Sequence, residues 1–240
     1  MKRTKQPEEV NVEDYMEKPR PNLFNVIKKL RDNKRAFKRF LIVGKVNQDQ
    51  VKPDSAEKEF ESYYGRIAGT DEISGLLAIL GNQFVHFLET DGNHGFRMLK
   101  QIEEDIKGGK PCPVKSAHII TFTEEKETQV FPQNFVKSLP ASGSNKEMKE
   151  QTTEEQAQML YDSFLEIGRN VTSASSQSAD AVSKALKMGV GEHVPAGEEL
   201  DSMMRPDVMD LQEFNEYIAT PPDILLEKEL VWPGEPDLVY

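Results

Sequence analysis

The residues best suited to chemistry in this chain are histidines and a single cysteine. They are His86, His94, His118, His193 and Cys112. A zinc site needs short-range ligand pairs such as C-x-x-C or H-x-x-x-H, and the sequence contains neither. Cys112 lies between two prolines, and the sequence places no base beside it to activate the thiol. The sequence therefore predicts no metal site and no nucleophilic residue.

Other motifs also fall short of a catalytic pattern. Gly108-Gly109-Lys110 lacks the first glycine and the final Ser/Thr of a P-loop, so it predicts a turn. Ser74 stands in I-S-G-L and not in G-x-S-x-G, so it predicts a strand hydroxyl. One enzyme hypothesis stays open. His86 and His118 fall in expected strands, and they would form a new site if their rings met across the sheet.

Composition limits the class of protein. The chain has 240 residues, a net charge of -11 and one cysteine. The negative charge argues against nucleic-acid binding, and the lone cysteine excludes an internal disulfide and fits a reducing, cytoplasmic compartment. No apolar run reaches the roughly 18 residues of a membrane span, so no membrane contact is expected.

The hydrophobic pattern predicts the elements that position these residues. Strands are expected at 37–46, 73–80, 83–90 and 114–123, and helices at 54–68 and 93–107. Gly81-Asn82 is a two-residue hairpin link. Asp54 and Glu57 are expected to form a capping box at the start of the first helix. Phe131-Pro132 begins a short extended piece.

This order, β-α-β-β-α-β over residues 37–138, predicts an α+β fold of the ferredoxin-like class, an antiparallel sheet with two helices on one face. Residues 139–153 have the composition of a linker. A helical segment follows over 154–219, with helices at 154–169, 173–188 and 207–219. Glycines and a proline between 189 and 197 are expected to break the chain.

The two ends differ in charge. Residues 1–36 form a polar arm with a short amphipathic helix at 23–30, which either packs on the domain or docks elsewhere. The basic run 28–39 is a solvated flank, a contact for an acidic protein surface such as a microtubule wall, or a nucleic-acid contact, which the acidic C-terminal part disfavours.

The tail at 220–240 is acidic, apolar and interrupted by prolines, so it cannot be one long helix. It either lies along a partner or wraps its own domain. If it binds a partner, the expected anchors are Leu225, Leu226, Leu230 and Trp232.

The sequence motifs within these elements resemble those of the BLUF domain, a blue-light sensor that uses FAD. Residues 73–77 (ISGLL) are similar to the family's I-T-G-L-L, and residues 84–89 (FVHFLE) to its F-L-Q-V-L-E. Phe131-Pro132 is similar to the start of its F-P-x-W turn. The resemblance covers the domain at 37–138 and implies a BLUF-type fold.

The residues that handle the flavin in that family are replaced. Carried over by position, its tyrosine falls at Val43, its glutamine at His86, its asparagine at Ala68 and its tryptophan at Asn134. Valine and alanine have no hydrogen-bonding side chain. The resemblance therefore implies no working flavin relay and no bound FAD. The alternative is a flavin-binding sensor with altered or absent photochemistry.

The degenerate domain, together with its basic and acidic extensions, resembles the testis-expressed protein 47 family. That resemblance implies a non-enzymatic structural and interaction protein in the cytoplasm, built into the cytoskeleton of the cilium or sperm flagellum as an axonemal component. Its expected partners are axonemal or microtubule-associated proteins.

Overall fold

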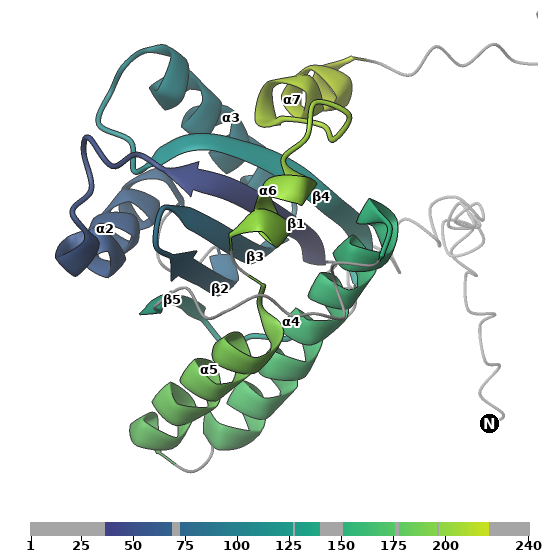
Figure 1. The fold of residues 1–240 in the computed structure, drawn as a ribbon. Coiled ribbons are helices and arrows are strands. Elements are labelled where there is room, and N and C mark those ends of the chain that lie inside the picture. The colour runs from purple at the N-terminus through teal and green to yellow at the C-terminus, as the bar shows by residue number, and fades with distance from the viewer. Residues whose placement is uncertain are drawn as a thin grey trace, which may run out of the picture. The chain divides into compact units, whose positions relative to one another are not determined.

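A five-stranded sheet lies at the centre of the computed structural model (Figure 1). The structure describes residues 37–68, 73–126, 128–139, 151–175, 178–195 and 197–220. These all belong to the unit Ala36–Tyr240, and the other unit is Met1–Arg35. Several predictions lie outside the described residues: the arm 1–36, most of the linker 139–153, and the docking anchors Leu225, Leu226, Leu230 and Trp232.

The sheet has the order β4-β1-β3-β2-β5. Neighbouring strands are antiparallel except β2 and β5, which are parallel. The strands are β1 (Phe37–Val46), β2 (Ile73–Leu80), β3 (Gln83–Asp91), β4 (Val114–Lys126) and β5 (Asn134–Leu139). The first four have the ferredoxin-like order, so the predicted fold class is confirmed. The piece after Phe131-Pro132 adds β5 at the edge.

The predicted hairpin is also confirmed. Leu80 pairs with Gln83, and Gly81 between them has φ +67°, a backbone conformation that glycine adopts without a steric penalty. All eight residues of β2 are buried. Both faces of this part of the sheet are therefore covered, which is why the strand is a continuous apolar run without alternation.

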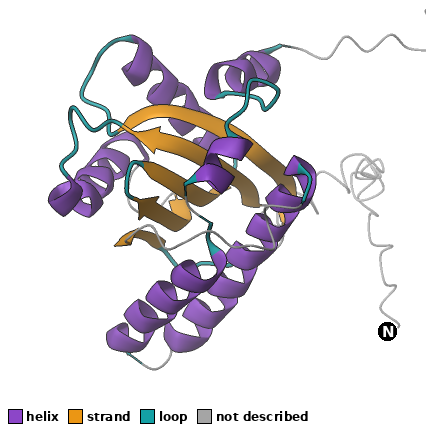
Figure 2. Ribbon diagram, in the orientation of Figure 1, coloured by secondary structure: helices purple, strands orange, loops and turns teal. Residues whose placement is uncertain are grey.

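Helices α2 (Ala56–Ala68) and α3 (His94–Lys107) cover one face of the sheet, called here the α2/α3 face (Figure 2). A 3-10 turn, η2 (Pro53–Ser55), leads into α2. The predicted capping box of Asp54 and Glu57 is wrong. No side chain caps this start, and Glu57 instead accepts a hydrogen bond from the Ser138 backbone on β5 at 2.7 Å.

The opposite face, called the α4/α5 face, is covered by the helical segment. Its helices are α4 (Thr153–Ser175), α5 (Ala179–His193) and α6 (Glu198–Met203). The predicted break at Gly189 is wrong, because α5 continues through it. A Cβ at Gly189 would lie 2.7 Å from Ile167 Cγ1, so this glycine lets α4 and α5 pack closely.

Helix α7 (Leu211–Ala219) returns to the α2/α3 face at the β4 edge. The Ile119 backbone N–H donates to Met209 O at 3.0 Å just before the helix begins. Phe214 packs into an aromatic group with Phe40, Phe96 and Phe122. Within the described part of the chain, no helix is long and apolar enough to cross a bilayer.

Candidate functional site

His86 lies within β3 on the α2/α3 face and is 0% exposed. Its ring centroid is 5.0 Å from that of Tyr64 on α2. Neither imidazole nitrogen has a hydrogen-bond partner in the described structure, and the same holds for the buried Asn134 Oδ1 on β5. An unpaired buried polar group costs roughly 1–3 kcal/mol, so both side chains lower stability as they stand.

Burial lowers the pKa of His86 to about 3, because the imidazolium would lose its hydration. The Asn134 side chain acts in the opposite direction, but it makes no hydrogen bond of normal geometry to the ring. His86 is therefore neutral near physiological pH, and it exchanges no proton there.

Val43 and His86 are two of the four positions matched to the flavin residues, and the structure places them on opposite faces of the sheet. Val43 pairs with Val85 and belongs to the α4/α5 face, whereas His86 pairs with Ile42. Residues directly opposite in a sheet share a face, so Ile42 is the β1 residue beside His86. Ala68 ends α2 at the rim of the same core.

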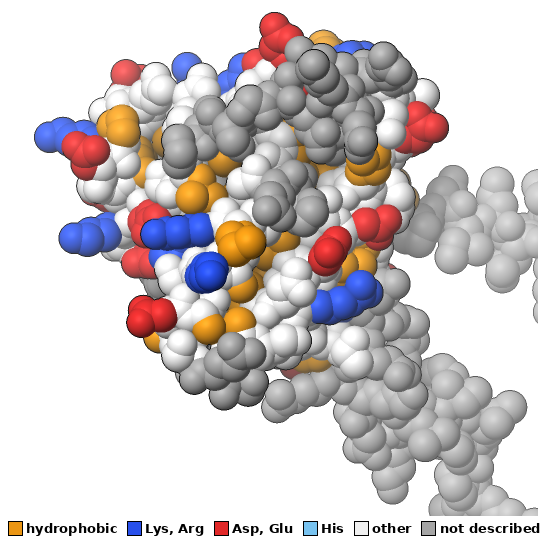
Figure 3. All heavy atoms as spheres, turned by 60° about the horizontal axis from the view of Figure 1, so that its bottom comes forward, with side chains coloured by type: hydrophobic (Ala, Val, Ile, Leu, Met, Phe, Trp, Pro, Cys, Tyr) orange, Lys and Arg blue, Asp and Glu red, His pale blue; other side chains and the backbone are white. Residues whose placement is uncertain are grey.

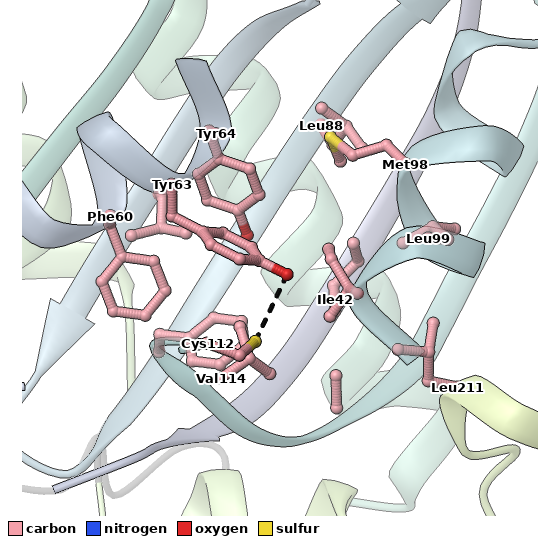
Figure 4. Packing of buried hydrophobic residues seen from close by; sticks show 14 of the residues in the cluster. Ile42, Phe60, Tyr63, Tyr64, Leu88, Met98, Leu99, Cys112, Val114 and Leu211 are labelled. Carbon is pink, nitrogen blue, oxygen red and sulfur yellow. Dashed lines mark hydrogen bonds between the residues drawn. The ribbon is translucent and has the colours of Figure 1, made fainter. Parts of the chain in front are cut away.

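The space between α2 and α3 is filled with side chains (Figure 4). Tyr63 and Tyr64 point in from α2, and Met98 and Leu99 from α3. Each of these four side chains is no more than 5% exposed. Interiors pack at the density of organic crystals, so a ring the size of a flavin would need these side chains to move.

The second polar group on this side centres on Tyr63. Cys112 Sγ donates to Tyr63 Oη at 3.3 Å, and Tyr63 Oη donates to Asp105 Oδ2 at 3.1 Å. Burial raises the pKa of the Cys112 thiol. Burial also opposes ionisation of Asp105, but hydrogen bonds from Gln101 and Tyr63 hold the pKa of Asp105 below its usual value. The thiol is therefore protonated and shielded, which fits a structural cysteine.

The hypothesis of an enzyme site formed by His86 and His118 is wrong. His118 pairs with Val43 on the α4/α5 face, so the sheet separates the two rings. Among the described residues, no group of three or more His, Cys, Asp or Glu side chains could hold a metal ion.

Sequence reasoning missed a buried cluster around Glu89. Arg39 Nε donates to Glu89 Oε1 at 2.8 Å, and Ser74 Oγ lies 3.5 Å from Oε2. The backbone N–H groups of Val130 and Phe131 donate to the same carboxylate. The signal in the sequence was the presence of Arg39 and Glu89 within the largely apolar segments that form β1 and β3. The carboxylate fixes the loop before β5 onto the sheet.

The strand order and the helices define a ferredoxin-like α+β domain. A family model described as Testis-expressed protein 47 matches residues 36–220, which is more than half of the chain. The chain belongs to the testis-expressed protein 47 family. The match ends at Thr220, the residue that follows α7 and the last one that the structure describes. No curated protein matched the sequence.

Three solved structures are similar at low identity. The BLUF domain of BlrP1 is 15% identical with a TM-score of 0.29, covering 43% of this chain and 64% of that one. BlrP1 of Klebsiella pneumoniae in a calcium/cy-diGMP complex is 16% identical with a TM-score of 0.30, covering 44% and 24%. A bacterial light-regulated adenylyl cyclase is 14% identical with a TM-score of 0.31, covering 64% and 40%. The chain thus spans less than two thirds of each, and the fold assignment rests on the strand order.

Proposed function

We propose that this chain is a non-enzymatic structural protein that docks other proteins in the sperm flagellum, as a component of the axoneme. The observation that carries the proposal is the filled α2/α3 face, where Ile42 and the neutral His86 stand among buried side chains. Close packing of this kind suits a face that supplies shape and stability. The testis-expressed family supports the tissue.

In this proposal the domain is a rigid scaffold, and the residues after α7 make the contact with the partner. Those residues include the apolar anchors Leu225, Leu226, Leu230 and Trp232. Large apolar side chains that are flanked by acids suit a partner surface with an apolar groove and a basic rim. Such partners would be axonemal or microtubule-associated proteins.

The test is a pull-down from testis or ciliated cells with the full chain and with a chain ending at Thr220. The cut is placed there because α7, which ends at Ala219, packs in the core through Leu211 and Phe214. Partners are expected to bind the full chain and to be lost from the shortened one. Tyr217→Ala, at a side chain that is 68% exposed, is the matched surface control. If the shortened chain kept every partner, the docking role of the tail would be wrong.

A second candidate, a flavin-binding sensor, is favoured by one observation. The two His86 ring nitrogens and Asn134 Oδ1 are buried without a hydrogen-bond partner in the described structure, at two of the positions matched to the flavin residues of BLUF domains. The filled space between α2 and α3 argues against it. The test is the visible absorbance of the purified protein before and after denaturation. We expect no flavin spectrum in either state, and release of flavin on unfolding would overturn the proposal of a scaffold without a cofactor.

A further inference from the structure

The two edges of the sheet differ in whether another segment of the described chain pairs with them. At the β4 edge, His118 forms an isolated antiparallel β-bridge with Asp210 through the backbone, and the Met209 carbonyl accepts a hydrogen bond from the Ile119 N–H. At the other edge, β5 has no strand partner on its outer side among the described residues. An edge of this kind offers backbone donors and acceptors to an added extended segment.

The register shows which groups β5 offers. Gln133 O accepts from Gly75 N on the β2 side, whereas Ser138 N points outward and is bonded by Glu57. Alternate residues of a parallel edge strand bond to the same side, so the backbone groups of Asn134 and Val136 also point outward. Glu57 covers only the far end of the edge.

A groove of about 490 Å³ lies beside this edge, between β5 and α5. Its lining includes the apolar residues Phe135, Val182 and Leu186 and the serines Ser178 and Ser183. Lys137 is the single charged residue of the lining. On the surface that comes forward in Figure 3, hydrophobic side chains are exposed between scattered charged ones. The groove therefore suits an extended segment with large apolar side chains and carboxylates.

We propose that this groove binds residues 221–240 of the same chain. Of the other long segments outside the described residues, 1–36 has a net positive charge, with ten Lys and Arg against six Asp and Glu, and 140–150 has Met148 as its one large apolar residue. Residues 221–240 combine apolar and acidic side chains, with Lys228 as the one base. Their carboxylates complement Lys137, whose Nζ is 3.7 Å from the partly exposed Glu57 and can share a second acid.

The length of the segment is sufficient. Twenty extended residues span roughly 66 Å, and a domain of this size has a radius of gyration of roughly 16 Å. A sphere with that radius of gyration is roughly 42 Å across, so the end of a fully extended segment can reach the far side of the domain from Thr220. The inference rests on the proposed function, because it uses the same docking segment, and it adds where that segment lies when no partner is present.

Trp232 is the only tryptophan in the chain, so its fluorescence reports on this segment alone. In the full chain we expect blue-shifted emission and protection from acrylamide quenching, both independent of protein concentration. Lys137→Glu should lower the ratio of docked to free segment about two- to fivefold, the range for an exposed ion pair. Ser183→Arg should release the segment by filling the groove.

Matched controls are available on α5. Lys184→Glu makes the same charge change, and Met188→Arg the same gain of an arginine, at exposed residues outside the groove lining. Both should leave the Trp232 signal unchanged, and circular dichroism checks that every variant is folded.

A solvent-exposed Trp232, or a protected one that ignores both groove variants, would overturn the inference. Protection lost on dilution would overturn it in favour of a second copy's segment. The pull-down tests the proposed function separately, because partners can bind the segment whether or not the groove holds it.

Discussion

Arg39 and Glu89 face each other directly across β1 and β3, with Arg39 Nε 2.8 Å from Glu89 Oε1. Their side chains are 7% and 0% exposed. Arg39 Nη2 also donates to Thr128 O at 2.6 Å, and Glu89 accepts from Val130 and Phe131. One buried ion pair therefore bonds to the loop that leads into β5 at Thr128, Val130 and Phe131.

Glu89→Gln should destabilise the domain strongly. The amide leaves the Arg39 charge buried without its counter-ion, and losing one partner of a buried pair costs about 3–5 kcal/mol. Urea unfolding followed by circular dichroism measures the loss. Glu124→Gln is the control, because the Lys38–Glu124 pair is partly exposed and should change stability by less than about 1 kcal/mol. Equal losses for the two variants would contradict the assigned role of Glu89.

The stability of the domain should fall with acid in a way that depends on His86. The pKa of His86 is about 3 in the folded protein, against an ordinary value of 6.5 for a histidine in water, so the unfolded chain binds the proton first as the pH falls. Stability is fully present above pH 6.5 and is lost toward pH 3, by about 1.4 kcal/mol per pH unit.

His86→Leu should flatten that slope, because it removes the titrating group from the same buried position. It should also leave stability at neutral pH unchanged or higher, since an unpaired polar group is lost with it. The comparison is made with His118→Leu, whose pKa is also lowered by burial but at a half-buried position. If wild type and His86→Leu gave parallel curves of stability against pH, His86 would not be the buried neutral histidine described.

Cys112 should react slowly with thiol reagents in the native state. Its thiol is buried, its pKa is raised by that burial, and its Sγ–H is bonded to Tyr63 Oη. Tyr63→Phe removes this hydrogen bond and the one to Asp105, so it should cost about 1–3 kcal/mol and speed the reaction. Because Cys112 is the only cysteine, a colorimetric thiol assay measures it directly. Tyr217→Phe, at an exposed tyrosine, should change neither rate nor stability.

Gly168→Ala should weaken the contact between α4 and the loop before β5. A Cβ at this position would lie 2.2 Å from Val130 Cγ1 and 3.0 Å from the Phe131 ring. Overpacking of this kind costs about 1–3 kcal/mol, more than the roughly 1 kcal/mol that alanine gains in helix propensity. Thermal or urea unfolding measures the net change.

Gly65→Ala in α2 separates the cost of overpacking from the gain in helix propensity. A Cβ at Gly65 meets nothing within 4 Å, so only the gain in propensity applies and the variant should be more stable than wild type. If Gly168→Ala were also stabilising, α4 would not pack on Val130 as closely as described.

The sequence by itself determined the order of the elements in the sheet domain. Alternating elements and the Gly81-Asn82 turn were enough for the hairpin and the ferredoxin-like class, because a two-residue link leaves β2 and β3 little choice but to pair.

Only the tertiary structure decided which residues share a face. β1 and its neighbours are covered on both sides, so their apolar runs do not alternate and do not show which residues face which side. The register of β1 against β3 places Ile42 beside His86, and Val43 points to the opposite face. The same packing continued α5 through Gly189, because close approach to Ile167 matters more there than the low helix propensity of glycine. It also placed Glu89 inside the protein, where distant backbone N–H groups and Arg39 compensate a charge that local sequence would leave in water.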